Sequence, residues 1–125
     1  MTTRKPTASE LEILQVLWER GPSTVREVHD ALSTKKPIGY TSVLKLMQIM
    51  TAKGTLRRNE EQRAHVYEAA QPAEKTKRQL AMDVLQRVFD GSACDLMMHA
   101  LSGQATKEEI EEMRRMLSEY ERRLR

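Results

Sequence analysis

Five polar side chains of a predicted helix over residues 40–53 fall mostly on the face opposite its apolar residues. They are Tyr40, Thr41, Ser42, Lys45 and Gln48. Hydroxyl groups and an amine near the start of a helix can reach base edges in the major groove, and a tyrosine can reach a phosphate or a thymine methyl. No arginine or asparagine lies on this face, which limits bidentate base contacts. Sequence preference is therefore expected from few direct contacts, from symmetry and from DNA shape.

Positive charge surrounds this helix. Between Ala31 and Asn59 there are six basic residues and no acidic one. Residues 1–70 hold 11 basic and 8 acidic side chains, whereas residues 71–125 hold 10 of each, so the net charge of +3 belongs to the first half. A basic surface with a helix that fits a groove indicates duplex DNA as the partner. The further candidate contacts are Thr24, Lys53, Arg57, Arg58 and Arg63.

The two strand arginines are not equivalent candidates. At least one of Arg57, Arg58 and Arg63 is expected to touch DNA. Strand alternation places Arg57 and Arg58 on opposite faces of a hairpin, so these two need not both do so. Glu60 and Glu61 at the predicted hairpin tip oppose contact with a polyanion. A solvated hairpin is the alternative interpretation of this segment.

Composition excludes several other classes of protein. The single cysteine, Cys94, rules out a disulfide within the chain and an all-cysteine metal site, and is typical of a reducing cytosol. No apolar run approaches the roughly 18 residues that span a bilayer. The sequence predicts a cytoplasmic protein without membrane insertion, in which Cys94 is a small buried side chain.

Sites for enzyme chemistry or bound metal are not indicated. The chain has no glycine-rich phosphate loop, no nucleophile motif and no paired carboxylates off the solvated helix surfaces. His29, His65 and His99 have no metal-ligand spacing with one another or with Cys94. We expect no enzyme activity, no cofactor and no metal site.

The elements that position the candidate contacts follow the order of a winged helix-turn-helix. Capping-box pairs at Thr7/Glu10 and Thr24/Glu27 begin two helices, and Gly54 ends the third. Residues 56–59 and 65–69 alternate as two strands of a hairpin, and residues 22–24 can add a minimal third strand. The expected fold is mainly α, with three helices plus a β-hairpin wing in residues 1–71.

Pro72 marks the expected start of a second, helical domain over residues 72–125. Helices are predicted over residues 73–89 and 93–101, and after a Thr106/Glu109 capping box. The last has an apolar residue every three or four positions, as in a helix-pairing seam. The expected function is dimerisation, through Leu80, Val84, Val88, Leu96, Met97, Leu101, Ile110, Met113, Leu117 and Tyr120.

Several segments together resemble the penicillinase-repressor family of transcription factors, the BlaI/MecI group. The segments that carry the likeness are residues 6–14, Leu17-Trp18, residues 25–28, residues 40–43, Lys53-Gly54, residues 56–58 and Tyr67. The resemblance implies a homodimeric repressor of a two-fold symmetric DNA operator. It also implies derepression by proteolysis in the C-terminal region, driven by a membrane-bound metalloprotease receptor.

The implied cleavage region departs from the family pattern. The Asn-Phe pair that the family cleaves is absent, and the local pattern places His99-Ala100 there, within a residue or so. The candidate cleavage region is therefore Met98, His99 and Ala100. Either another bond is cut or control differs.

Two rival functions fit the same element order. A winged helix can serve as a protein-interaction adaptor that does not bind DNA. Alternatively, the chain can be a regulator that senses a ligand or a metal at its dimer interface. Steep salt dependence of binding to duplex DNA separates a repressor from an adaptor.

Overall fold

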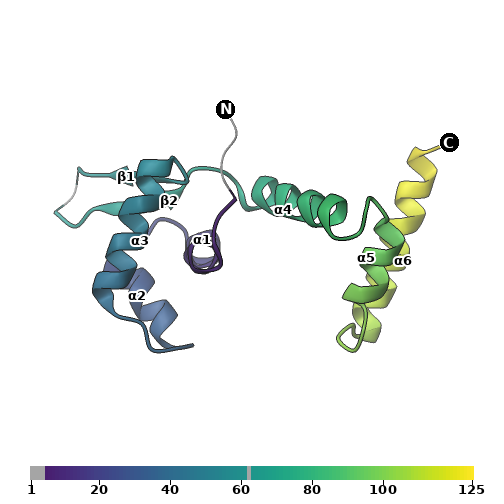
Figure 1. Ribbon diagram of the computed structural model, residues 1–125, viewed down its shortest axis with the longest axis horizontal. Helices are drawn as coiled ribbons and strands as arrows, with labels where there is room; N and C mark the ends of the chain where they lie inside the picture. The colour runs from purple at the N-terminus through teal and green to yellow at the C-terminus, as the bar shows by residue number, and fades with distance from the viewer. Residues whose placement is uncertain (1–4, 62) are drawn as a thin grey trace. The chain divides into compact units, whose positions relative to one another are not determined.

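The computed structural model describes residues 5–61 and 63–125, which form two compact units dividing between Leu80 and Ala81. The first unit contains three helices, a two-stranded hairpin and the start of a fourth helix, and helices alone make up the second (Figure 1). The predicted mainly helical fold with an N-terminal winged helix is confirmed. The division lies inside the fourth helix, and the functional boundary at residue 72 stays a prediction.

The three helices of the first unit begin and end where local signals place them. They are α1 (Ala8–Arg20), α2 (Val25–Ser33) and α3 (Tyr40–Lys53). Complete capping boxes at Thr7 and Thr24 satisfy the free amides of the first turns of α1 and α2. Gly54 ends α3 with a φ of 85°, a left-handed conformation that costs glycine little.

The wing is an antiparallel hairpin of β1 (Leu56–Asn59) and β2 (Val66–Ala69). The second strand begins one residue later than expected. Leu56 pairs with Ala69 and Arg58 pairs with Tyr67. The expected third strand is confirmed as a single bridge, in which Ser23 and Tyr67 exchange backbone hydrogen bonds of 2.9 and 2.8 Å.

A closed core joins these elements. Each of the three helices contributes apolar side chains at helical spacing, and Leu56 and Tyr67 add one from each strand. The buried members are Ile13, Leu14, Leu17, Val25, Val28, Leu32, Val43, Met47, Met50, Leu56 and Tyr67. Because α3 packs on α1, α2 and β1, the inner half of its surface is fixed and its outer half is free.

The second part of the chain carries α4 (Ala73–Arg87), α5 (Ala93–Ala100) and α6 (Lys107–Arg123). A complete capping box begins α6, and the Ser92 hydroxyl accepts a hydrogen bond from the Asp95 amide at the start of α5. Within residues 73–123, all of which the structure describes, no helical residue is buried. No described helix is long and apolar enough to cross a bilayer.

Three expectations in this region need correction. The fourth helix ends at Arg87 instead of Phe89, because the chain turns through Asp90 and Gly91, both with positive φ. The fifth ends at Ala100, with Leu101 as its cap. Cys94 is exposed in the single chain, so the prediction of a buried thiol is wrong for one chain, in which α5 buries no residue.

Candidate nucleic-acid interface

The predicted contact residues of α3 all lie outside the core. All five are exposed, and the Tyr40 side chain at the start of the helix retains 41% of its accessible surface. The opposite face is buried through Val43, Met47 and Met50. This division follows from the 3.6-residue period, since apolar positions at i, i+4 and i+7 share one side. The structure thus leaves Thr41, Ser42, Lys45 and Gln48 exposed away from the core, and places Tyr40 at the edge of this face, beside α2.

An ion pair between a buried carboxylate and a partly exposed lysine holds α3 in place. One oxygen of Glu10 lies 2.8 Å from Nζ of Lys53, and the other accepts the Thr7 amide at 3.1 Å. The Glu10 side chain is only 4% exposed. Burial raises the pKa of this carboxyl, but the bonds from Lys53 and the Thr7 amide outweigh burial and leave the pKa below its usual range. The pair links the first turn of α1 to the last turn of α3.

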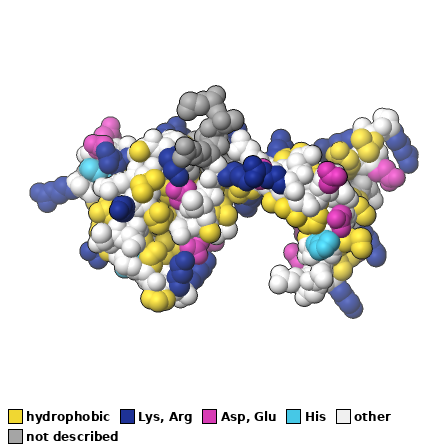
Figure 2. Space-filling model, in the orientation of Figure 1, with side chains coloured by type: hydrophobic (Ala, Val, Ile, Leu, Met, Phe, Trp, Pro, Cys, Tyr) yellow, Lys and Arg dark blue, Asp and Glu magenta, His cyan; other side chains and the backbone are white. Residues whose placement is uncertain are grey.

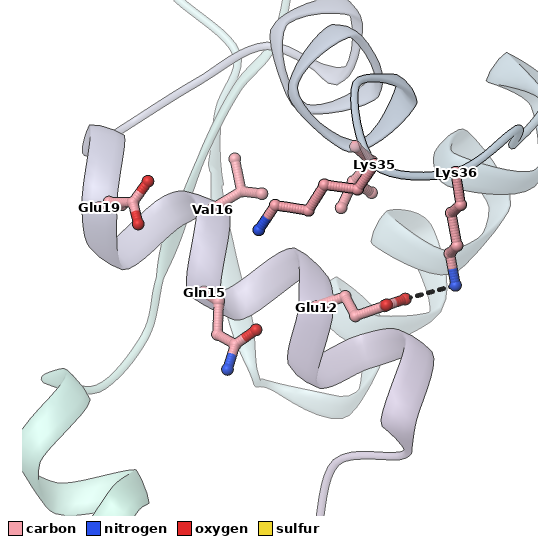
Figure 3. Close-up of a pocket in the computed structure, with 7 residues that line it drawn as sticks. Glu12, Gln15, Val16, Glu19, Lys35 and Lys36 are labelled. Carbon is pink, nitrogen blue, oxygen red and sulfur yellow. Dashed lines mark hydrogen bonds and ion pairs between the residues drawn. The ribbon is translucent and has the colours of Figure 1, made fainter. Parts of the chain in front are cut away.

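The candidate cations fall into two groups, and the first group is already engaged with carboxylates. Lys53 binds Glu10, and Lys36 binds Glu12 of α1 at 2.8 Å (Figure 3). Each partner lies far away in the sequence, which is why the acid-free stretch between residues 31 and 59 overstates the free positive charge. The ion pair of Lys53 with Glu10 stabilises the fold, and the sequence did not predict it.

The two strand arginines belong to the same engaged group. Arg57 lies 3.8 Å from Glu68 and donates to the Ala70 carbonyl at 3.3 Å. Arg58 donates to Glu60 at 2.8 Å, and its hydrogen bonds to Tyr67 and Glu60 raise the pKa of its guanidinium. Surface ion pairs of this kind are weak, so either arginine can exchange its carboxylate for a phosphate.

The second group has no carboxylate partner among the described residues. It contains Arg26, Lys35, Lys45 and Arg63. Lys45 lies on the outer face of α3, and Arg63 follows the tip of the wing. Arg26 is an exposed residue of α2 that the sequence interpretation missed. Its signal was its position off the apolar stripe of Val25, Val28 and Leu32, in the helix before α3.

Thr24 differs from the other candidate contacts because its hydroxyl is occupied. It accepts the Glu27 amide at 3.2 Å and donates to the Glu27 carboxylate at 3.3 Å. The Thr24 side chain therefore caps the start of α2. Its hydroxyl would have to give up these hydrogen bonds before it could bind a nucleic acid.

A small hollow lies behind the helix-turn-helix. Lys35 and Lys36, from the turn that follows α2, lie over α1 beside Glu12, Gln15 and Val16 (Figure 3). The Lys36–Glu12 ion pair closes one side. The hollow is lined by charges of both signs, which is typical of a solvated junction between helices and not of an anion site.

The predicted dimer contacts remain uncovered in the single chain. Apolar side chains reach the surface of both units (Figure 2). Large apolar side chains are exposed on α4 and α6. Val88, just after the end of α4, is 68% exposed, and Leu117 of α6 is 64% exposed. Val84, Met97, Leu101, Ile110 and Tyr120 are also exposed, and Leu80, Leu96 and Met113 are half-buried. Whether a partner covers them stays a prediction.

The candidate cleavage residues are accessible. Met98 is 67% exposed, and His99 and Ala100 are exposed as well. His99 lies against the Phe89 ring at 5.4 Å between centroids, and its Nδ1 lies 3.4 Å from the Asp95 carboxylate. These contacts hold the last turn of α5.

Comparison with known proteins identifies the family. A family model described as penicillinase repressor matches residues 6–119. Two curated relatives, both described as transcriptional regulator BlaI, come from Mycobacterium tuberculosis strains CDC 1551 / Oshkosh and H37Rv. Each is 31% identical over 114 residues, which cover 90% of this chain and 82% of the relative. The winged helix agrees with these matches, and the chain belongs to the penicillinase repressor family.

Proposed function

We propose that this transcriptional repressor binds a two-fold symmetric operator in duplex DNA as a homodimer. In the proposal, α3 enters the major groove and the wing lies along the backbone. The observation that carries it is the division of α3 into a buried face and an outer face of hydroxyl, amide and amine donors. Because α3 packs against three other elements, it can present these donors to DNA without changing its own position.

The electrostatic contribution comes mainly from the unpartnered cations. Lys45 supplies the charge on α3 itself, and Arg63 supplies it at the wing. Neither side chain has a described carboxylate partner to leave before it binds a phosphate, whereas Lys53 must break its ion pair with the buried Glu10 carboxylate. We therefore rank Lys53 below Lys45 and Arg63 as a DNA contact.

In the proposal, dimerisation is the task of residues 72–125. The uncovered apolar groups on α4, α5 and α6 give a second copy a surface to bury. Two linked winged helices bind two half-sites, and linkage raises the affinity for the whole operator. A bound dimer then blocks transcription by occupying the site.

Release from DNA is proposed to follow a cut in α5. The segment from Met98 to Ala100 is accessible in the single chain, and the chain has positive φ at Gly91 and Gly103 on either side. A cut there separates α4 from α6, and each part then has too little apolar surface to hold the dimer. The proposed protease is a membrane-bound metalloprotease receptor that acts on a residue pair other than Asn-Phe.

The first test measures binding to duplex DNA from upstream of the protein's own gene. Fluorescence anisotropy across a salt series should give a tight complex with two chains per site and a steep fall in affinity with salt. A scrambled duplex should bind far more weakly. Affinity that is absent or independent of salt would favour the adaptor function and contradict the repressor.

A second test addresses release. A specific protease site is introduced between Met98 and Leu101, and mass and operator affinity are measured before and after cutting. We expect the cut protein to be monomeric and weakly bound. A cut protein that remains dimeric and bound would show that control lies elsewhere.

A further inference from the structure

Arg26 is an exposed cation of α2 whose charge is not neutralised by a described carboxylate. Its guanidinium carbon lies 5.7 Å from the centroid of the Tyr40 ring, within the range of a cation–π contact. The neighbouring Glu27 faces Arg20 instead, at 3.8 Å. A neutral ring therefore restrains the Arg26 side chain, and its donors stay available to an anion.

The Tyr40 ring is held in turn by His29. The Nε2–H group of His29 donates to the Ile38 carbonyl at 2.8 Å, just before α3 begins. Its imidazole meets the Tyr40 ring edge-on, with centroids 5.9 Å apart and planes at 74°. Arg26 and His29 are three residues apart on α2 and so share one helix face. Both contact the first residue of α3.

We propose that Arg26 contacts a phosphate of the bound DNA, and that Tyr40 acts by positioning Arg26 and not by reading a base. This inference rests on the proposed DNA-binding function. In a helix-turn-helix the first helix crosses the DNA backbone while the second lies in the groove, and Arg26 belongs to the first. The Arg26–Tyr40–His29 cluster thus joins the backbone-contacting helix to the start of the base-contacting helix.

The chemistry of the pair suits a phosphate. A guanidinium offers a planar fork of donors that matches two phosphate oxygens, and it stacks on aromatic faces. The ring limits the conformations of Arg26 without cancelling its charge, so less side-chain freedom is lost on binding. A phosphate contact carries no direct sequence information. The cluster is therefore expected to set affinity and register, while Thr41, Ser42 and Lys45 set base preference.

Arg26→Gln in the intact protein tests the phosphate contact. Binding should weaken by the same factor for the operator and for a scrambled duplex, and the slope of log affinity against log salt should fall by about 0.9 per chain. The matched control is Arg115→Gln, an exposed residue of α6 off the apolar seam, which should leave the slope unchanged. Arg26→Lys keeps the charge and should keep the slope while losing some affinity.

The outcomes separate this inference from the proposed function. If the slope of log affinity against log salt is unchanged in Arg26→Gln, the phosphate contact is wrong, but the proposed repressor function is not contradicted. A loss confined to the operator also overturns it, because it would show base reading. Circular dichroism melts of each variant confirm that the fold is retained, as expected for an exposed side chain.

Tyr40→Phe and Tyr40→Leu test the positioning role. Phe keeps the ring under Arg26 and loses only the hydroxyl, so affinity should stay within about twofold of the unmodified protein, since a surface substitution that keeps the packing costs little. Leu removes the ring and should weaken binding several-fold. In a double-mutant cycle, Tyr40→Leu should cause little further loss of DNA affinity when Arg26→Gln is already present. Equal losses for Phe and Leu, or additive losses in the cycle, would overturn the positioning role.

Discussion

The winged helix and the three helices that follow it differ in what they bury. The winged helix closes a core of eleven apolar side chains, whereas no residue of α4, α5 or α6 is buried in the single chain. Both regions have amphipathic helices with good caps. The contrast shows that caps and periodicity define a helix, while a stable unit requires a surface against which the apolar face can pack.

A similar contrast exists among the cations of the winged helix. Lys53, Lys36, Arg57 and Arg58 have carboxylate partners, and Arg26, Lys35, Lys45 and Arg63 have none among the described residues. Charge in the sequence is therefore a poor measure of charge available to DNA. Of the unpartnered group, we propose that Arg26, Lys45 and Arg63 contact the nucleic acid, whereas Lys35 lines the hollow against α1.

The largest expected effect breaks the closed core. Ile13→Ala should lower the free energy of unfolding of the winged helix by roughly 2–5 kcal/mol, since it leaves a cavity at a fully buried position. Urea titration of the intact protein provides the measurement. The matched control is Leu117→Ala, which is 64% exposed in the single chain and should leave that transition unchanged while weakening dimerisation. Equal shifts of the winged-helix unfolding transition in the two variants would contradict the idea that only the winged helix has a closed core.

Deleting residues 81–125 should leave a folded winged helix that binds operator weakly. The core lies entirely before Leu80, so a cooperative melt should remain. Loss of the linked second copy should weaken operator binding by roughly 100-fold. Calorimetry and anisotropy give the two readouts. A truncated chain that binds as tightly as the intact one would show that the C-terminal helices do not couple two copies.

Lys45→Ala sharpens the comparison between the two groups of cations. If Lys45 reaches a base edge, operator affinity should fall by roughly 1–3 kcal/mol and preference for the operator should relax. Lys36→Ala serves as the matched control, because Lys36 is paired with Glu12 and lies off α3. Equal losses for the two variants would mean that the pairing seen in the structure does not decide which cations bind DNA.

The smallest expected effect concerns the Glu10–Lys53 pair. The folded-state pKa of Glu10 is depressed, so its stabilising contribution is present above the unfolded pKa and is lost as pH falls through the folded pKa. Glu10→Gln should therefore destabilise the winged helix by about 1 kcal/mol at pH 7 and by less at a pH below the folded-state pKa of Glu10. Thermal melts at both pH values measure the difference. A gap that does not shrink in acid would mean that Gln disturbs packing and not the ion pair.

Local signals in the sequence predicted most of the winged helix. Capping boxes at Thr7 and Thr24 act over three residues, and Gly54 acts through its own φ. The outer face of α3 also followed from sequence, because helical periodicity fixes which side chains share a side. These features depend on neighbours within a turn or two, so the sequence by itself determined them.

Tertiary structure decided which groups are free to act. Glu10 is 43 residues from Lys53, and Glu12 is 24 residues from Lys36, so no local pattern could pair them. The sequence places Arg26 off the apolar stripe of α2, but only folding brought α2 against the start of α3 and placed its guanidinium over Tyr40. Cys94 proved exposed for the same reason, since an apolar stretch is buried only where another element of the fold covers it.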